Sequence, residues 1–320
     1  MSVVLFAVHI VPVDSKRTWF GYFAFSDSVL TVVQDDYELR SYAYEADIVD
    51  VACTRCHVIV ALEGDVCIIS HINFIENGVK IVPEKQSLRN VRIRQLSDSR
   101  IPTRFREHAC IDPIVIASMR RAYYIQRDED AGVTNLFKIF ENDGFKCEEV
   151  KTKIPGMVVQ CASGSDFFLF LTDRKVVYSM GTGLHGELGR GIIVDEAEPT
   201  EVNVPDEEVW KIAAGTWHAA ALTKKGDLYV WGWNKYGQLG TDVRCFESLF
   251  YSYLKDFIEP YPYPVDPFEL FNIEEDAITD VIADRFSTKI IIERDGGHQI
   301  FTLGSKPRMH ESEMVEEDRE

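Results

Sequence analysis

Apolar runs short enough for single strands recur along most of the chain, and polar or glycine-containing turns separate them. Successive pairs of such runs predict β-hairpins, which begin near residues 4, 57, 122, 167, 218 and 287. No stretch carries the period of about 3.6 residues that marks a long amphipathic helix. The pattern therefore predicts an all-β protein built from small antiparallel sheets.

The first half of the chain predicts its hairpins less regularly than the second. Residues 3–25 hold two apolar runs joined by polar residues 14–17, which predict the turn of a hairpin. Residues 47–70 repeat this theme with a turn at 63–65. Residues 71–107 are more polar and basic, and the strands expected there are 79–82 and 91–96.

Two segments of the second half are repeats of one another. Val177–Gly189 returns as Leu228–Gly240, and equivalent residues such as Gly181 and Gly232 lie 51 positions apart. A unit of this length cannot bury its own apolar face, so neighbouring units must stack. Four-stranded units at this spacing fit a β-propeller, in which radial repetition leaves only short sheet edges. Strands are expected at 157–162, 167–172, 175–180, 201–204, 209–214, 218–223 and 227–232.

The remaining segments complete the expected domain. Residues 241–277 are an insertion rich in aromatic residues and proline, and 278–304 predict a last, degenerate hairpin unit. Residues 305–320 are polar and acidic, as is typical of a disordered tail. We therefore expect a single propeller domain over residues 1–304 followed by this tail.

Charge and cysteine content narrow the classes of function. The 52 acidic side chains exceed the 34 basic ones, which gives a net charge of −18. This negative charge repels nucleic-acid phosphates, so we expect no direct sequence-specific nucleic-acid binding. A basic, histone-like protein partner remains compatible with the charge. The seven cysteines have no framework spacing, which suits a reducing interior. No apolar stretch reaches the roughly 18 to 20 residues that span a bilayer, so we expect no membrane association and a location in nucleus and cytoplasm.

Three motifs carry a resemblance to a known family. Gly215–His218, Leu228–Gly232 and Asn234–Gly240 resemble the repeat of the regulator-of-chromosome-condensation (RCC1) propellers, and the likeness is fullest over residues 157–240. The resemblance implies a propeller that normally has seven blades, whereas six hairpins are visible here. Either residues 71–107 contain a further blade, or the N-terminal hairpin supplies strands that relatives take from their C-terminus; we favour the second.

One branch of that family resembles the chain further. The WFGYF run at 19–23 and the aromatic insertion are similar to short proteins that are little more than the repeat domain. This resemblance implies a chromatin-associated scaffold linked to chromosome segregation, a monomer within a hetero-complex, with a JmjC-type histone demethylase or hydroxylase, histones, or both as partners. The alternative is guanine-nucleotide exchange on a Ran-like small GTPase, the founding activity of the family. It requires a loop that distorts the GTPase's nucleotide site, and no feature marks such a loop.

Candidate chemical motifs favour structural interpretations. Gly181, Gly183 and Gly186 match the dinucleotide-binding fingerprint, but no helix is predicted after them to hold a pyrophosphate. Cys53 and Cys56 have no second pair at zinc-ligand spacing, so we interpret them as structural. His57 and His218 each begin a predicted strand, and no nucleophile accompanies them. We expect a histidine that bonds the backbone of a neighbouring blade, and no catalytic, cofactor-binding or metal-binding residues.

The same patterns divide the remaining residues into structural and partner-binding candidates. The expected structural residues of the repeat are Gly181, Gly186, Gly189, Gly215, His218, Trp231, Gly232, Gly237, Leu239 and Gly240, and Trp210 is expected in the core. Rigid aromatic side chains lose little entropy on binding, and the partner-binding candidates are Trp233, Tyr236, Tyr251, Tyr253, Phe257, Tyr261 and Tyr263. Prolines that alternate with tyrosines keep the insertion out of a central strand. The insertion therefore either binds a partner or covers an edge of its own propeller.

Overall fold

The computed structural model describes residues 14–18, 21–26, 28–34, 37–63, 66–75, 78–88, 110–111, 115–141, 145–205, 208–240, 258–271, 277–294 and 297–304. Within these ranges the strands form six sheets with antiparallel pairing. The chain divides into two compact units, Met1–Cys161 and Ala162–Glu320, and the division falls within a strand.

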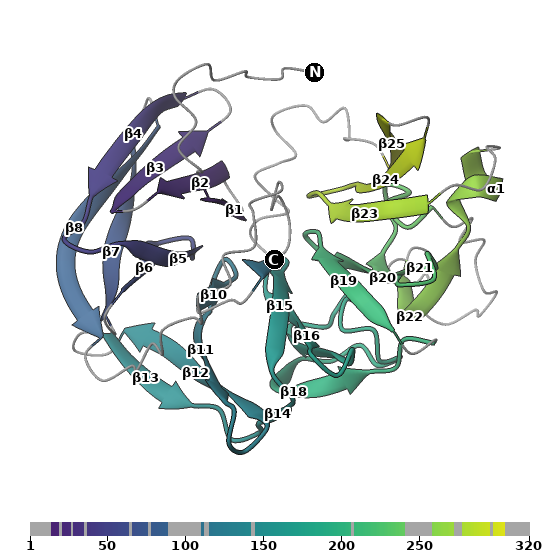
Figure 1. Cartoon of the computed structure of the whole chain (residues 1–320), viewed down its shortest axis with the longest axis horizontal. Coiled ribbons are helices and arrows are strands. Elements are labelled where there is room, and N and C mark those ends of the chain that lie inside the picture. The colour runs from purple at the N-terminus through teal and green to yellow at the C-terminus, as the bar shows by residue number, and fades with distance from the viewer. Residues whose placement is uncertain are drawn as a thin grey trace. The chain divides into compact units, whose positions relative to one another are not determined.

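The N-terminal unit contains three sheets in which strands that are neighbours in sequence pair with each other (Figure 1). The first has the order β1 (Asp14–Thr18), β2 (Gly21–Ser26), β3 (Val29–Gln34), β4 (Tyr37–Ala43). The second has the order β5 (Ile48–Cys53), β6 (His57–Leu62), β7 (Val66–Ile75), β8 (Gly78–Leu88). The third has the order β10 (Val115–Ala117), β11 (Ala122–Asp128), β12 (Val133–Glu141), β13 (Phe145–Glu149), and β14 (Ile154–Pro155) also pairs with β12.

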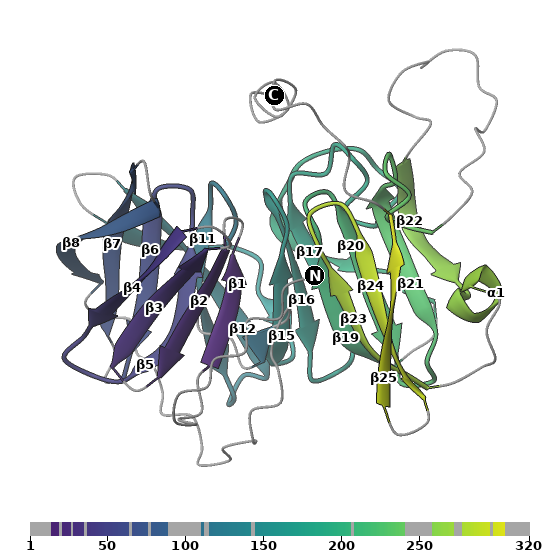
Figure 2. The same ribbon diagram turned by 90° about the horizontal axis from the view of Figure 1, so that it is seen from above.

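The C-terminal unit is built in the same way, and Figure 2 shows its strands from the side. One sheet has the order β18 (Glu196–Val202), β17 (Val177–Gly181), β16 (Phe167–Thr172), β15 (Val158–Ser163), and β15 contains the division between the units. The short β9 (Cys110–Ile111) belongs to the N-terminal unit and pairs with Gln160 and Cys161 of β15, which also lie in that unit. The next has the order β19 (Val209–Ala214), β20 (His218–Thr223), β21 (Leu228–Trp233), β22 (Ile258–Val265). A helical turn, α1 (Pro267–Phe271), leads towards the last sheet, β23 (Ala277–Ala283), β24 (Thr288–Arg294), β25 (Gly297–Leu303).

The hydrophobic cores lie between neighbouring sheets, which explains why many strands are apolar at consecutive positions. In β6, Val58 and Val60 share a core with Leu30 of the preceding sheet. The intervening Ile59 points to the other face and shares a core with Val115 of the following sheet. Because successive side chains of a strand point to opposite faces, a sheet buried on both faces requires an uninterrupted apolar run.

The N-terminal half departs from the sequence predictions at three places. Residues 14–17, expected as a turn, lie in β1, because the hairpin partner of β2 is this polar stretch. The strands β3 and β4 were not predicted. The strand expected at 79–82 is part of β8, which joins the sheet of β5 to β7 and leaves no separate sheet within the described residues 71–75 and 78–88. Residues 3–13 and the strand expected at 91–96 lie outside the described residues.

The C-terminal half follows the predictions more closely. The strand expected at 201–204 begins earlier, as β18 at Glu196. Part of the proline-rich insertion forms β22, which lies at the edge of its sheet, as the missing N–H groups of its prolines require. Residues 241–257 and the tail at 305–320 lie outside the described residues.

The expectation that Trp210 packs in the core is wrong, since its side chain is 37% exposed. The register between β19 and β20 shifts between Val209 and Lys211, so that Trp210 is the extra residue of a β-bulge. Its indole Nε1 donates to the carbonyl oxygen of Thr223 at 3.1 Å. The hydrogen-bonding end of the ring is therefore held while the rest is exposed.

Gly232 combines two reasons for having no side chain. Its φ is +101°, in a region that L-residues avoid. A Cβ there would lie 2.5 Å from the carbonyl oxygen of Trp217 and 2.8 Å from Cα of His218. Gly226, in the turn before β21, has a similar φ of +94°, but a Cβ there would meet no other atom within 4 Å.

Comparing substitutions of Gly226 and Gly232 separates the cost of backbone strain from the cost of a steric overlap. We expect Gly226→Ala to lower the free energy of unfolding by about 1–2 kcal/mol, the cost of a left-handed conformation. Gly232→Ala adds an overlap with backbone atoms and should cost about 1–3 kcal/mol more. Urea denaturation of both variants measures the difference, and equal destabilisation would show that the approach of Gly232 to Trp217 contributes nothing.

Candidate functional site

Three sheets of the C-terminal unit share one local contact. In each, a glycine at the end of the third strand has a positive φ, and a Cβ on it would lie within 2.7 Å of the carbonyl oxygen of a residue in the turn between the first two strands. The pairs are Gly181 with Asp166, Gly232 with Trp217, and Gly304 with Phe286. Asp166, Trp217 and Phe286 therefore occupy equivalent positions in successive sheets.

Backbone hydrogen bonds join these turns from sheet to sheet. The N–H of Ser165 donates to the carbonyl oxygen of Thr216 at 2.9 Å, and the N–H of Thr216 donates to that of Arg285 at 3.4 Å. The N-terminal unit repeats the contact, with the N–H of Arg55 donating to the carbonyl oxygen of Met119 at 2.7 Å. Side chains of neighbouring turns are consequently held close together.

Five rings gather at the turns of the C-terminal unit, and we call His185, Trp217, Trp233, Tyr236 and Phe286 the aromatic cluster. Trp217 and Trp233 meet edge to face with centroids 4.9 Å apart. The ring of His185 lies 5.2 Å from Trp217 and 5.3 Å from Trp233. Tyr236 lies 5.5 Å from Trp233 and 4.9 Å from Phe286. Three consecutive sheets therefore contribute to one continuous set of ring contacts.

The cluster is only partly covered by the protein. Trp233 is buried at 7% exposure, whereas His185, Trp217, Tyr236 and Phe286 are all half-buried. Aromatic side chains of this kind present a large, rigid apolar area whose ordering entropy has already been lost. The arrangement is thus suited to contact with another molecule.

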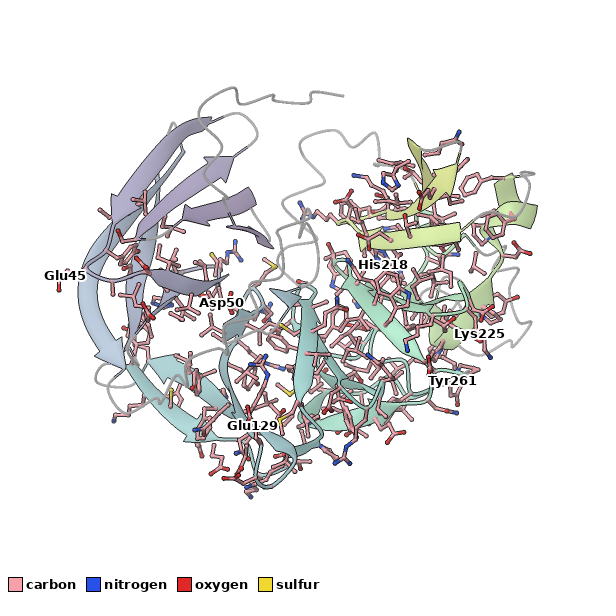
Figure 3. All side chains as sticks on the ribbon, viewed as in Figure 1. Glu45, Asp50, Glu129, His218, Lys225 and Tyr261 are labelled. Atoms are coloured by element: carbon pink, nitrogen blue, oxygen red, sulfur yellow. The ribbon has the colours of Figure 1, made fainter. Side chains whose placement is uncertain are left out.

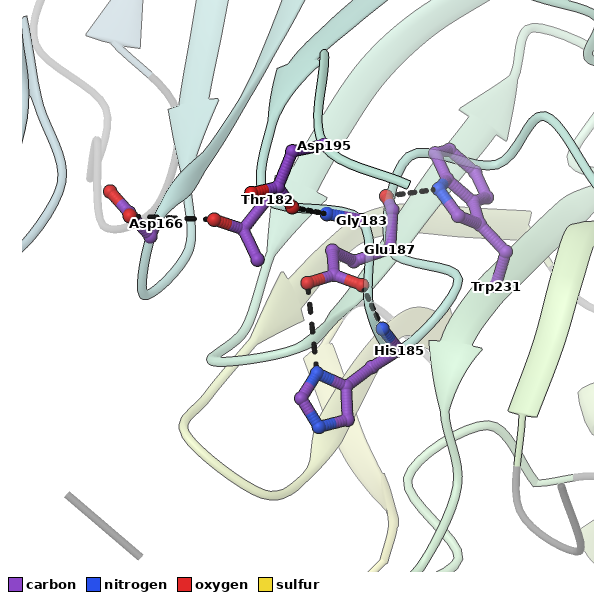
Figure 4. Close-up of polar contacts among 7 residues, drawn as sticks. All are labelled: Asp166, Thr182, Gly183, His185, Glu187, Asp195 and Trp231. Carbon is purple, nitrogen blue, oxygen red and sulfur yellow. Dashed lines mark hydrogen bonds and ion pairs between the residues drawn. The ribbon is translucent and has the colours of Figure 1, made fainter. Parts of the chain in front are cut away.

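The preceding sheet shows that the fold does not require these tryptophans. Fifty-one residues before Trp217 and Trp233 stand Asp166 and Thr182. There the Thr182 hydroxyl donates to the Asp166 carboxylate at 3.4 Å (Figure 4). One backbone framework therefore accommodates a polar pair in one sheet and an aromatic pair in the next.

A buried acceptor stabilises the turn that carries His185. The backbone N–H of His185 donates to the carboxylate of Glu187 at 2.7 Å, and the imidazole Nδ1 lies 3.8 Å from the same carboxylate (Figure 4). In the next sheet, the N–H of Tyr236 donates in the same way to the side-chain oxygen of Gln238 at 2.8 Å. Glu187 and Gln238 are each only 1% exposed, so this acceptor is a constant part of the turn.

Two exposed cations lie against the cluster. The Lys235 ammonium is 5.3 Å from the Trp233 ring centroid and 5.6 Å from that of Tyr236. The Arg285 guanidinium is 5.1 Å from the ring centroid of Phe286. These distances fall within the range of cation–π attraction, which orients both cations at the rim of the cluster.

Comparison with known protein families identifies the repeats. The family model described as "Regulator of chromosome condensation (RCC1) repeat" matches residues 176–222 and 225–267, and a second model of this repeat matches 211–238. The C-terminal unit of this chain therefore contains RCC1 repeats. "RCC1 domain-containing protein 1" of Mus musculus is 40% identical over 88 residues, which are 27% of this chain and 23% of the mouse protein. The "RCC1-like G exchanging factor-like protein" of Mus musculus is 38% identical over 88 residues, 26% of this chain and 19% of that protein.

A solved RCC1-type structure shows that the fold is an all-β propeller. Prp20p from Saccharomyces cerevisiae, whose structure was reported with its binding to Gsp1p and histones, has a TM-score of 0.53. The likeness covers 88% of this chain and 71% of that one at 13% identity, so it speaks for the fold alone. The sequence matches cover less than a quarter of the curated relatives.

The cysteine and glycine motifs singled out in the sequence lie at the end of β5, in the turn after it and in the turns after Gly181. Among the described residues, no group of three or more His, Cys, Asp and Glu side chains could hold a metal ion. Cys53 ends β5 and is buried, whereas Cys56 is exposed in the turn that follows. After Gly181 comes a series of turns with Gly186 at φ +75°, in place of the helix that a dinucleotide fingerprint needs. The described part of the chain has no helix with the length and hydropathy of a membrane span.

The partner-binding candidates of the sequence fall into three groups. Trp233 and Tyr236 lie in the aromatic cluster. Tyr261 and Tyr263 lie on β22 and are 59% and 47% exposed, and Figure 3 shows Tyr261 at the outer side of the C-terminal unit. The structure brings neither tyrosine into the cluster contacts. Tyr251, Tyr253 and Phe257 lie outside the described residues.

Sequence reasoning missed three members of the cluster, His185, Trp217 and Phe286. A signal for Trp217 was available, because aligning the two RCC1 repeats sets it against Asp166. Phe286 had no such signal, since its unit is degenerate and its equivalence appears only from the contact of Gly304. His185 aligns with Tyr236, but its packing against the next blade is visible only in three dimensions.

Most of the structural candidates lie at contacts between blades, whereas Gly181 and Gly232 approach the turn of their own blade. Gly181, Gly186, Gly189, Gly232, Gly237 and Gly240 have positive φ values. The others allow or make close packing: Gly215 beneath the ring of His218, and the fully buried Trp231 and Leu239. The indole Nε1 of Trp231 donates to the carbonyl oxygen of Glu187 in the preceding blade at 2.9 Å (Figure 4).

His218 is fully buried in the C-terminal unit and has no access to a substrate (Figure 3). Its Nε2 lies 3.0 Å from the hydroxyl of Thr288, which in turn donates to the carbonyl oxygen of Gln238 at 2.8 Å. The Thr288 hydroxyl must therefore accept from Nε2–H. The expected bond to a neighbouring blade is made, but with a hydroxyl. Burial lowers the pKa of His218 to about 4, against a smaller opposing effect of the Ser287 backbone.

Because His218 is buried as the neutral form, we expect the free energy of unfolding to fall in acid. Between pH 6.5 and about 4 the unfolded chain binds a proton that the folded His218 does not, so stability falls with pH by up to about 1.4 kcal/mol per unit. Phe167 is the equivalent residue of the preceding blade and packs in the same way over Gly164. His218→Phe should therefore fold and show a flatter dependence. Urea denaturation from pH 7 to pH 4.5 compares the two, and identical slopes would contradict this origin.

Proposed function

We propose that this RCC1-repeat protein is a non-enzymatic interaction scaffold that binds a protein partner through the aromatic cluster. The observation that carries the proposal is the exchange of the Asp166–Thr182 pair for Trp217 and Trp233 in otherwise equivalent blades. Trp217 is half-buried and Trp233 is nearly buried. Indole rings that the framework itself does not need are typical of the anchor residues of protein interfaces.

The surroundings of His218 and His185 favour a scaffold role. His218 is buried and neutral, and its ring is engaged with the neighbouring blade. His185 has a carboxylate beside it but is enclosed by two indole rings, with no nucleophile in the same set of contacts. A binding role therefore accounts for these side chains better than general acid–base or covalent catalysis does.

We infer that the partner is a chromatin protein of the JmjC oxygenase class, and that the complex acts in chromosome segregation. The support is the similarity to the mouse RCC1 domain-containing protein 1 over 88 residues, together with the resemblance of the chain to chromatin-associated short RCC1 proteins. Histones are a second candidate, given the net charge of −18 and the histone binding named for Prp20p. Such a scaffold would be a monomer within a hetero-complex, present in nucleus and cytoplasm.

Exchanging the aromatic pair for the polar pair of the preceding blade tests this proposal. Trp217→Asp with Trp233→Thr should keep the fold, because Asp166 and Thr182 occupy the same framework. Recovery of the JmjC-type oxygenase in affinity purification with quantitative mass spectrometry should fall at least about tenfold, since aromatic anchors dominate binding energy.

The matched control is Trp210→Thr, which removes an exposed tryptophan of the same blade outside the cluster. We expect it to retain the partner. Undiminished recovery with the double variant, or equal loss with the control, would contradict docking at the cluster. Circular dichroism and thermal unfolding verify that each variant is folded.

The second candidate is guanine-nucleotide exchange on a Ran-like GTPase. It is favoured by the similarity to the mouse RCC1-like G exchanging factor-like protein. Release of fluorescent GDP from a panel of small GTPases separates the two functions. The scaffold proposal expects no acceleration by the purified chain, whereas acceleration of about tenfold or more with one GTPase would establish exchange activity.

A further inference from the structure

We propose that the aromatic cluster binds an acidic protein segment that carries an aromatic anchor. This inference rests on the proposed docking function and names the chemistry of the partner. It is opposite to what the overall charge of the chain suggests, because 52 acidic against 34 basic side chains favour a basic partner at long range.

The charges at the rim of the cluster are positive. Lys235 and Arg285 are both exposed and lie over Trp233, Tyr236 and Phe286. A cation stacked on a ring is already oriented, so less side-chain entropy is lost when it pairs with a carboxylate. The rim therefore favours carboxylates beside the rings.

The carboxylates on the same turns already have partners within the protein. Glu187 is almost fully buried and accepts from the N–H of His185 at 2.7 Å. Asp284, next to Arg285, lies 2.6 Å from the ammonium of Lys289. Asp166 accepts from the Thr182 hydroxyl at 3.4 Å. These acids are engaged within the protein, and Lys235 and Arg285 are exposed beside the rings.

The cations occur only where the rings occur, among the equivalent positions of the described C-terminal blades. The residue equivalent to Lys235 in the preceding blade is Leu184, which is 56% exposed. The residues equivalent to Arg285 are Ser165 and Thr216, which make the same backbone contacts between blades. The framework thus tolerates neutral residues at both positions, and the cations are a feature of the cluster.

The net negative charge of the chain and the two cations at the rim favour partners of opposite charge, and the distance over which each acts decides between them. Fields from the rest of the molecule are screened within about 8–10 Å at ordinary salt, whereas paired groups at the rim lie closer than that. Like charges brought together at an interface oppose binding. A lysine-rich segment would meet Lys235 and Arg285, and an acidic segment would pair with them while its aromatic side chain contacts the rings edge to face.

Defined polymers test this chemistry without a known partner. The intact chain is passed over immobilised random copolymer of glutamate and tyrosine, polyglutamate, and random copolymer of lysine and tyrosine. Biolayer interferometry at about 50 and about 300 mM NaCl measures affinity and its salt dependence. The variant Lys235→Glu with Arg285→Glu reverses the rim. Its control, Lys224→Glu with Lys225→Glu, makes the same change in net charge at the β20–β21 turn of the same blade.

We expect the glutamate–tyrosine copolymer to bind the wild type more tightly than polyglutamate does. The rim variant should lose at least about tenfold in affinity for that copolymer, while the control stays within about twofold. An unchanged affinity in the rim variant, or equal losses in rim variant and control, would overturn the proposal. So would binding of the lysine–tyrosine copolymer that disappears with Trp217→Asp and Trp233→Thr, because the cluster would then accept basic segments.

The same measurement separates failure of the two proposals. If the exchange of both tryptophans abolishes binding of the glutamate–tyrosine copolymer and the rim variant does not, the cluster docks a partner but acidity is not its criterion. If neither change affects any copolymer while both variants remain folded, docking at the cluster itself is wrong.

Discussion

The close approach of a glycine to a turn carbonyl is the constraint on which the described C-terminal blades depend. At Gly232 the backbone passes so near the oxygen of Trp217 that a Cβ would overlap it at 2.5 Å. This approach fixes the turn against the end of the third strand, and the hydrogen bond from Thr216 to Arg285 then fixes one turn against the next. The spacing between the turns therefore sets the spacing of the side chains that the turns carry.

A framework held by backbone contacts leaves its turn side chains free to differ. The same two positions carry Asp166 and Thr182 in one blade and two tryptophans in the next, with no change in the glycine contact. Stability is therefore supplied by glycines, by Trp231 and by the cores between blades, whereas the proposed recognition uses residues that the framework does not need. That separation explains how a single repeat supports binding surfaces of different character.

The two histidines of the repeat region show how position decides chemistry. His218 is enclosed between blades, where burial keeps its pKa near 4 and its ring serves as a neutral link to Thr288. His185 lies at the turn surface, between two indoles and beside a buried carboxylate. Likewise, the acidic chain presents two cations at the one place where aromatic rings gather, so net charge is a poor guide to the character of that surface.

The sequence by itself determined the all-β class, the propeller repeat and the glycine positions, because strands buried on both faces need unbroken apolar runs and positive φ needs glycine. It located Trp233 and Tyr236 but placed Trp210 in the core, since a β-bulge reverses the direction of a side chain without altering the apolar pattern. It also missed β3 and β4 and took the polar β1 for a turn, because pairing partners decide those strands. Only the tertiary structure brought His185 and Phe286 to Trp217, because residues 32 and 69 positions away from Trp217 in the sequence meet it through contacts between blades, which no local pattern encodes.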